Sequence, residues 1–159
     1  MNPRKILLES NGLTWPSQKA APKTSVGGAM ADQVDYSRVA RSCNLWRNFE
    51  DISSSWESIL RIIDYYDRHQ DEHIPTHGPG HWHDPDMLVI GNPGITVNMA
   101  IAQMTIWSIW SAPLIMSNDL RTIGPEFRYI LLNRDVIDID QDPMGRMGRL
   151  VAKVSRCHK

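Results

Sequence analysis

Short apolar runs alternate with helical patterns along this sequence, and this alternation constrains the fold more than any other feature. The predicted strands are 44–47, 87–90 and 114–116, and the predicted helices are 36–43, 54–68, 97–111 and one that opens at 124. Strands separated by helices are typical of an α/β fold with a parallel sheet. We therefore expect functional side chains on the loops that follow the strands, at their C-terminal ends.

Two of these helices carry clear start signals. Ser54 and Glu57 form a capping box, with Ser54 as the N-cap, and apolar residues follow at helical spacing to about residue 68. Thr96 can cap the helix over 97–111, which is apolar nearly all round and is therefore expected to be buried on most sides.

The segments between and beyond the helices are less regular. Residues 72–86 hold several His, Pro and Gly residues and are predicted to form an irregular loop, and a further strand is predicted to start near Val151. Gly and Pro also punctuate residues 1–33, which we expect to be loop or disordered.

Composition excludes several classes of protein. The chain has 159 residues and a net charge of −1, so it lacks the basic surface typical of nucleic-acid binding. Its two cysteines cannot form a disulfide-dense scaffold. The most apolar segment, 99–116, is too short and too polar to span a membrane. The apolar run at 6–8 is too short for a secretory signal, so the chain as written is expected to be cytosolic.

The first candidate site follows the strand at 44–47. Arg47 could bind a hydroxyl group or an anion, and Glu50 or Asp51 could exchange protons with a substrate. The alternative is that Asp51 only stabilises the N-terminal end of the next helix through the helix dipole.

The second candidate site is the segment 77–87. Its side chains invite a metal interpretation, but their spacing fits no closed zinc pattern, so no metal or cofactor is expected. Asp86, beside Met87 at the mouth of the predicted strand, is the better functional candidate. The alternative is a salt bridge or a turn cap for Asp84 and Asp86. The third cluster, 117–121, is interpreted as structural, with Asp119 paired to Arg121.

Several motifs between residues 34 and 151 resemble the α-galactosidase / α-N-acetylgalactosaminidase family of retaining glycosidases. The matching stretches are Cys43-Asn44-Leu45-Trp46-Arg47-Asn48-Phe49-Glu50-Asp51-Ile52, Ser55-Trp56, Gly78-Pro79-Gly80-His81-Trp82-His83-Asp84-Pro85-Asp86-Met87-Leu88, Ala112-Pro113-Leu114, Met116-Ser117-Asn118-Asp119-Leu120-Arg121 and Gln141-Asp142-Pro143-Met144-Gly145. The resemblance implies a (β/α)8 barrel followed by an antiparallel β domain. Residues 34–145 would then be the C-terminal part of the barrel, and 146–159 the start of the β domain.

The resemblance also implies roles for individual residues. Asp51 matches the acid/base, Arg47 a contact to a sugar hydroxyl or 2-substituent, and Asp86 and Met87 residues that line the sugar site. The implied substrate carries a terminal α-linked galactose or N-acetylgalactosamine, and the sequence leaves the choice between them open. Full-length members of such a family are expected to be homodimers in the lysosome or secreted.

The sequence also departs from the family pattern. It has no Lys-x-Asp-Gly-Cys motif, which carries the family's nucleophile, so this chain is expected to be inactive alone. A disulfide partner for Cys43 is missing unless Cys157 supplies it, and His83 stands where the family has Asn. A non-catalytic truncated fragment or splice product, at most a binding module, is the alternative function, and a metal hydrolase is a third.

Overall fold

Strands β1 (Leu45–Arg47) and β2 (Trp82–Asp84) pair in parallel, with Leu45 opposite Trp82 and Arg47 opposite Asp84. The structure is a computed structural model, and it describes residues 34–153. The chain between the two strands forms the crossover that parallel pairing requires. Parallel strands joined by helices agree with the predicted α/β plan.

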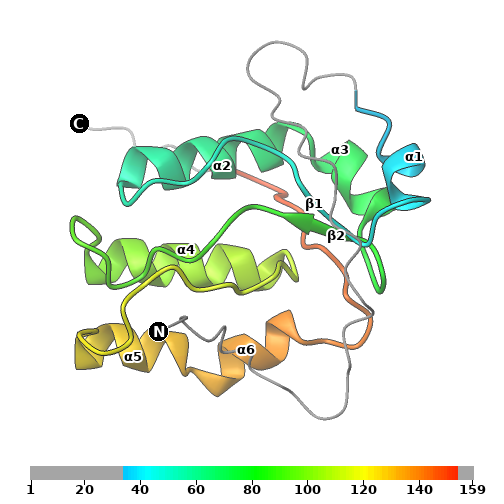
Figure 1. Cartoon of the computed structure of the whole chain (residues 1–159). Coiled ribbons are helices and arrows are strands. Elements are labelled where there is room, and N and C mark those ends of the chain that lie inside the picture. The colour runs from blue at the N-terminus through cyan, green and yellow to red at the C-terminus, as the bar shows by residue number, and fades with distance from the viewer. Residues whose placement is uncertain (1–33, 154–159) are drawn as a thin grey trace.

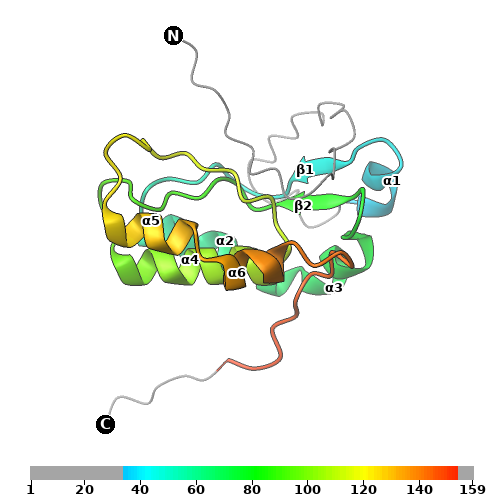
Figure 2. The same cartoon turned by 90° about the horizontal axis from the view of Figure 1, so that it is seen from below.

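The helices lie mainly on one side of this strand layer (Figures 1 and 2). The helical segments are α1 (Tyr36–Ala40), α2 (Trp56–Arg68), α3 (Gln70–His73), the 3-10 helix Ile74–Thr76, α4 (Val97–Ile109), α5 (Pro125–Leu131) and α6 (Arg134–Asp140). In Figure 2, α2, α4, α5 and α6 all lie below the strands. The core fills the space between the two layers, where Ile59, Leu88 and Trp107 are among the fully buried residues.

The predicted strand at 87–90 is wrong in position. The regular strand lies earlier, at Trp82–Asp84, and only Leu88 forms a parallel bridge, to Met116. Asp86 interrupts the strand because its φ of +80° is a left-handed conformation that no strand residue adopts. The predicted strand at 114–116 is likewise reduced to that single bridge.

Helix boundaries follow the sequence signals closely. Thr96 caps α4, and Gly124 is the N-cap residue before Pro125 of α5, as predicted. The cap of α2 is Ser55, whose side chain accepts a hydrogen bond from the Ser58 amide, so the prediction of Ser54 is wrong by one residue.

Two other expectations change, and a third stays a prediction. Helix α1 ends at Ala40 instead of residue 43. The segment 72–86 is not wholly irregular, because it holds the end of α3, the 3-10 helix and β2. Residues 146–153 contain no strand, so nothing in the described range shows the expected β domain, and residues 1–33 lie outside it.

A second, smaller core lies at the end of the sheet. It contains Tyr36, Cys43 and Trp46. Cys43 is buried and free in the part of the chain that the structure describes, and Cys157 lies beyond that part. Among residues 34–153, no helix is both long enough and apolar enough to cross a membrane.

Candidate active site

Arg47, the last residue of β1, lies between two carboxylates. Its Nη2 contacts Oδ1 of Asp51, and its Nη1 lies 2.7 Å from Oδ1 of Asp86. The structure therefore brings together three of the four residues predicted for the sugar site. Arg47 ends β1, Asp51 lies on the loop after β1, and Asp86 lies on the loop after β2, so all three are at the C-terminal ends of the strands.

The three groups differ strongly in their access to solvent. The Asp51 side chain is 97% exposed and that of Arg47 is 32% exposed, whereas that of Asp86 is 6% exposed. Asp51 lies before the N-cap Ser55, outside the first turn of α2, whose acidic residue is Glu57. Both carboxylates of this loop are ion-paired, Glu50 with Arg61 of α2 and Asp51 with Arg47, and Asp51 is the more exposed of the two, at 97% against 40%.

Asp86, on the loop after β2, forms hydrogen bonds that connect this loop to the loop after β1. Its Oδ2 accepts a hydrogen bond of 2.7 Å from the Ile52 amide, directly after Asp51. Its Oδ1 accepts from the Met87 amide at 2.8 Å and from Arg47. Trp107 of α4 donates its indole N–H to the Asp86 carbonyl at 2.8 Å, which holds this strained residue in place. Met87, the fourth predicted residue, is 38% exposed at the same loop.

Asp84, the last residue of β2, carries a second buried carboxyl group near Arg47. It accepts a hydrogen bond of 2.9 Å from the Asp86 amide and is buried. Burial raises the pKa of Asp84 to about 6, against the lowering effects of that hydrogen bond and of Arg47. The structural alternative raised for these two residues is thus observed, with Asp84 capping the turn and Asp86 in a salt bridge with Arg47, and the role of Asp86 at a sugar site stays a prediction.

Sequence reasoning missed a buried polar network directly behind Arg47. Asn48 donates its side-chain amide to Nδ1 of His83 at 2.7 Å, and its Oδ1 accepts from the Tyr66 hydroxyl at 2.8 Å. Trp46 also donates its indole N–H to Nδ1 of His83, at 3.1 Å. The sequence did hint at this network. Trp46 and Asn48 flank Arg47, and His83, on the strand opposite them, stands where the family has Asn.

The histidine-rich segment shows no cluster of metal-ligating side chains in the described part of the chain. Within residues 34–153, no group of three or more His, Cys, Asp or Glu residues has metal-binding geometry. His83 and Asp84 are neighbours on a strand and therefore point to opposite faces, and His81 is exposed.

The third cluster is structural, as expected. Asp119 accepts two side-chain hydrogen bonds from Arg121, at 2.9 and 2.7 Å. Ser117 and Asn118 donate to the carbonyls of Leu88 and Ile90, at 3.0 and 2.7 Å. These contacts connect the loop to the neighbouring segment 88–90.

Comparison with known proteins places this geometry in a family. The family model described as alpha galactosidase A matches residues 20–142, and therefore includes residues 20–33, beyond the range that the motifs cover.

Two curated relatives are similar over most of the chain. The alpha-N-acetylgalactosaminidase of Mus musculus is 48% identical over 145 residues, which are 91% of this chain and 33% of the relative. The alpha-galactosidase A of Homo sapiens is 49% identical over 134 residues, which are 84% of this chain and 28% of the relative. The chain thus spans about one third of the length of the relatives it matches.

The fold agrees with this assignment. Alpha-galactosidase I from Mortierella vinacea superimposes with a TM-score of 0.60 and 24% sequence identity, over 68% of this chain and 31% of that structure. Since the family model covers more than half of the sequence, this chain belongs to the alpha galactosidase A family.

Proposed function

We propose that this chain supplies the acid/base side of the sugar site in a glycoside hydrolase that removes terminal α-linked galactose or N-acetylgalactosamine with retention. The names of the relatives support the substrate class. The observation that carries the proposal is the pairing of the exposed Asp51 carboxylate with Arg47 at the C-terminal end of β1. Because the Asp51 side chain is exposed there, a substrate can contact its carboxyl group without a movement of the loop.

Each residue then has a role in the reaction. Asp51 protonates the glycosidic oxygen as the bond breaks and later takes a proton from water. Arg47, which is partly exposed, donates hydrogen bonds to a sugar hydroxyl or to the substituent at position 2. Met87 and the loop around Asp86 line the sugar, since Met87 is accessible at that loop.

Retention needs a second carboxylate about 5 Å from the first, acting as the nucleophile. The sequence has no Lys-x-Asp-Gly-Cys motif, so we infer that another part of the barrel provides this group. In this proposal the chain is the last portion of a (β/α)8 barrel that continues into a β domain, and it has no hydrolase activity alone. A homodimer in the lysosome or outside the cell remains a prediction from the family resemblance.

The test joins this chain to the preceding barrel segment of the Mus musculus relative and measures hydrolysis of aryl α-galactosides and α-N-acetylgalactosaminides. We expect the joined protein to be active and the isolated chain to be inactive. Asp51→Asn should lower kcat about 10²- to 10⁴-fold, the usual contribution of a general acid/base. Arg47→Ala should mainly raise KM.

Glu50→Gln is the matched control, because Glu50 is the neighbouring carboxylate and pairs with Arg61. It should leave kcat close to unchanged. An active Asp51→Asn variant of the joined protein would refute the acid/base role. Turnover by the isolated chain that Asp51→Asn abolishes would refute the inference that the nucleophile lies elsewhere.

A further inference from the structure

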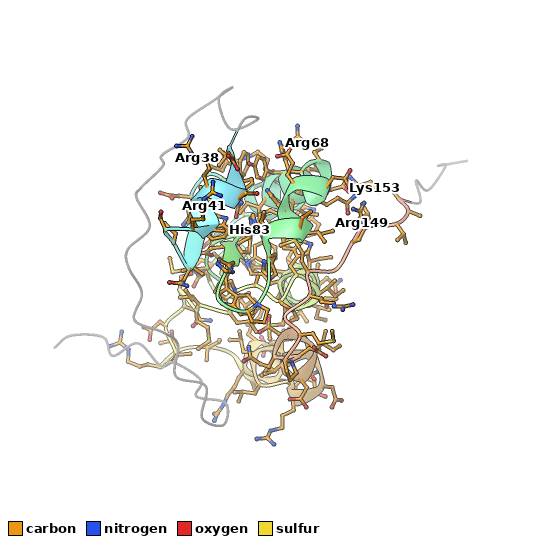
Figure 3. The ribbon with its side chains drawn as sticks, turned by 90° about the vertical axis from the view of Figure 1, so that its right-hand side faces the viewer. Arg38, Arg41, Arg68, His83, Arg149 and Lys153 are labelled. Carbon is orange, nitrogen blue, oxygen red and sulfur yellow. The ribbon has the colours of Figure 1, made fainter. Side chains whose placement is uncertain are left out.

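One nitrogen atom of His83, on β2, accepts hydrogen bonds from both sequence neighbours of Arg47, Trp46 and Asn48. Its Nδ1 accepts hydrogen bonds from the Trp46 indole at 3.1 Å and from the Asn48 amide at 2.7 Å. His83 is fully buried, and Figure 3 shows it between α1, which carries Arg38, and the helices near Arg68. The position of Arg47 at the end of β1 therefore depends on an imidazole on the adjacent strand.

The protonation state of this imidazole is fixed by its partners. An Nδ1 atom that accepts two hydrogen bonds carries no proton. On the other side, the Thr76 hydroxyl donates to the carbonyl of Glu72 or His73, at 3.0 or 3.1 Å. The same hydroxyl oxygen lies 2.9 Å from Nε2 of His83 and must accept from it. His83 is thus neutral, with its proton on Nε2.

The surroundings of His83 oppose a positive charge. The rings of Tyr36 from α1, His73 from α3 and His77 from the following loop lie 4.8, 4.6 and 5.8 Å from its ring. Burial, followed by His73 and His77, lowers the pKa of His83 to about 2.

The other titratable groups near His83 do not stabilise a positive charge on its ring. Burial also lowers the pKa of His73 to about 3 and that of His77 to about 4, so both stay neutral. Burial and nearby groups raise the pKa of Tyr66, which donates to Asn48, and this hydroxyl stays neutral as well. Asp84 follows His83 on the strand, and its carboxylate accepts from the Asp86 amide on the other face.

We propose that His83 is a pH-sensitive positioning residue for the Arg47–Asp51 pair, which holds Trp46 and Asn48 when neutral and releases them when protonated. The inference rests on the proposed function for its catalytic meaning, but its structural part can be tested separately. An asparagine, the family residue at this position, could accept from the same donors through its carbonyl oxygen and cannot take up a proton. His83 therefore makes the position of Arg47 acid-sensitive in a way that the asparagine implied by the family resemblance would not.

Linkage sets the sign of the effect. His83 has a lower pKa in the folded chain than the ordinary value of about 6.5, so the open or unfolded forms bind the proton. Its contribution is fully present above pH 6.5 and is lost as the pH falls. Well below pH 6.5 each pH unit shifts the opening equilibrium about tenfold, which amounts to about 100-fold between pH 7.5 and 4.5.

The experiment uses the whole chain with His83→Asn as the test variant and His81→Asn as the control. His81 is an exposed histidine two residues away, so the control removes a titratable group of the same kind. Urea unfolding between pH 7.5 and 4.5 gives the unfolding equilibrium constant of each protein. Other groups titrate equally in all three proteins, so they cancel in the differences.

NMR of the imidazole nitrogens of His83, the Trp46 indole proton and the Asn48 side-chain amide supplies a local readout. In the wild type, His83 should show the Nε2–H tautomer at pH 7.5, and the fraction of open form reported by the Trp46 and Asn48 signals should grow on acidification. In His83→Asn these two signals should stay in place, and its unfolding constant should rise about 100-fold less than that of the wild type or of His81→Asn.

Parallel unfolding curves for the wild type and His83→Asn would overturn the proposal. So would a folded wild type in which His83 titrates near pH 6.5 with unchanged Trp46 and Asn48 signals. In the joined barrel described above, kcat of the wild type should fall more steeply with acid than that of His83→Asn. If that protein shows no glycosidase activity, the proposed function fails. The role of His83 in holding Trp46 and Asn48 is still supported in that case, provided that the NMR result is as expected.

Discussion

Asp140 is a carboxyl group that the fold keeps in an unfavourable place. It is the last residue of α6 and only 5% exposed. Its Oδ2 accepts a hydrogen bond from Gln141, and its Oδ1 has no partner among the described residues. Burial raises the pKa of Asp140 to about 7, and the partial negative charge at the C-terminal end of a helix also disfavours an anion.

Asp140→Asn should therefore stabilise the chain in a pH-dependent way. A carboxyl group whose pKa is raised in the folded state costs nothing below its unfolded value of 3.8, and the cost grows until the pH passes about 7. The variant should match the wild type at pH 3.5 and exceed it by up to about 4 kcal/mol at pH 8, at 1.36 kcal/mol per pH unit. Urea unfolding at the two pH values measures the difference.

Asp138→Asn is the control for this effect. Asp138 lies on the same helix but is exposed, so its substitution should change the free energy of unfolding little at either pH. A stability gain by Asp140→Asn that is equal at pH 3.5 and pH 8 would contradict the explanation by charge burial.

At the scale of elements, the start of α2 separates the sequence prediction from the structure. The pattern of Ser54 and Glu57 predicts a cap at Ser54, whereas the structure uses Ser55, bonded to the Ser58 amide at 3.2 Å. Ser54 instead accepts a hydrogen bond from the Asn92 side chain at 3.1 Å. Consecutive serines offer the helix two possible caps, and a tertiary contact decides between them.

Ser55→Ala should lower the free energy of unfolding by about 1 kcal/mol, the usual value of an N-cap side chain. Ser54→Ala should cost about half a kcal/mol or less, because it removes a single exposed hydrogen bond. Thermal and urea unfolding of the two variants side by side provide the measurement. The reverse order would mean that Ser54, and not Ser55, caps α2.

The segment 87–90 shows why strand prediction fails where helix prediction succeeds. Leu88, Val89 and Ile90 are buried as expected of a strand, whereas Met87 is exposed, and side chains satisfy several backbone groups of the segment. Gln103 of α4 accepts from the Val89 amide at 3.1 Å and donates to the Met87 carbonyl at 3.2 Å. A buried glutamine from a distant helix leaves no trace in the local pattern, whereas helix caps such as Thr96 are local.

The candidate site divides in the same way. Arg47 and Asp51 could be found because they are close in sequence at the end of a predicted strand, and Asp86 because it matches a family motif. The family pattern draws attention to His83 and to the neighbours of Arg47, but the hydrogen bonds that join Asn48, His83 and Thr76 could not be predicted, since they require the register of β1 against β2 and the turn after α3. Contacts between segments that are far apart in the sequence determine whether a histidine is a metal ligand, a surface group or a buried hydrogen-bond acceptor, and residue type alone does not.

At the scale of the whole molecule, the described part has a covered side and an open side. The helices cover one side of the strand layer (Figure 2). Large apolar side chains are exposed as well, among them Ile101, Ile109, Tyr129 and Leu132. A pocket of about 380 Å³ lies between α4 and the helices α5 and α6. Sheet edges and apolar surface of this kind promote association between chains.

The isolated chain should therefore self-associate, and a complementary piece of barrel should suppress this. Sedimentation of the chain alone is expected to show species whose size grows with concentration. Added as a separate polypeptide, the preceding barrel segment of the Mus musculus relative should bind and raise the unfolding midpoint. A ligand that binds only the folded state stabilises it by RT ln(1 + [L]/Kd), about 2.7 kcal/mol at a concentration 100 times Kd. An unrelated barrel segment at the same concentration should leave the midpoint unchanged. A soluble monomer that unfolds cooperatively at all concentrations, unaffected by the complementary segment, would mean that residues 34–153 bury enough of their surface to form an independent unit.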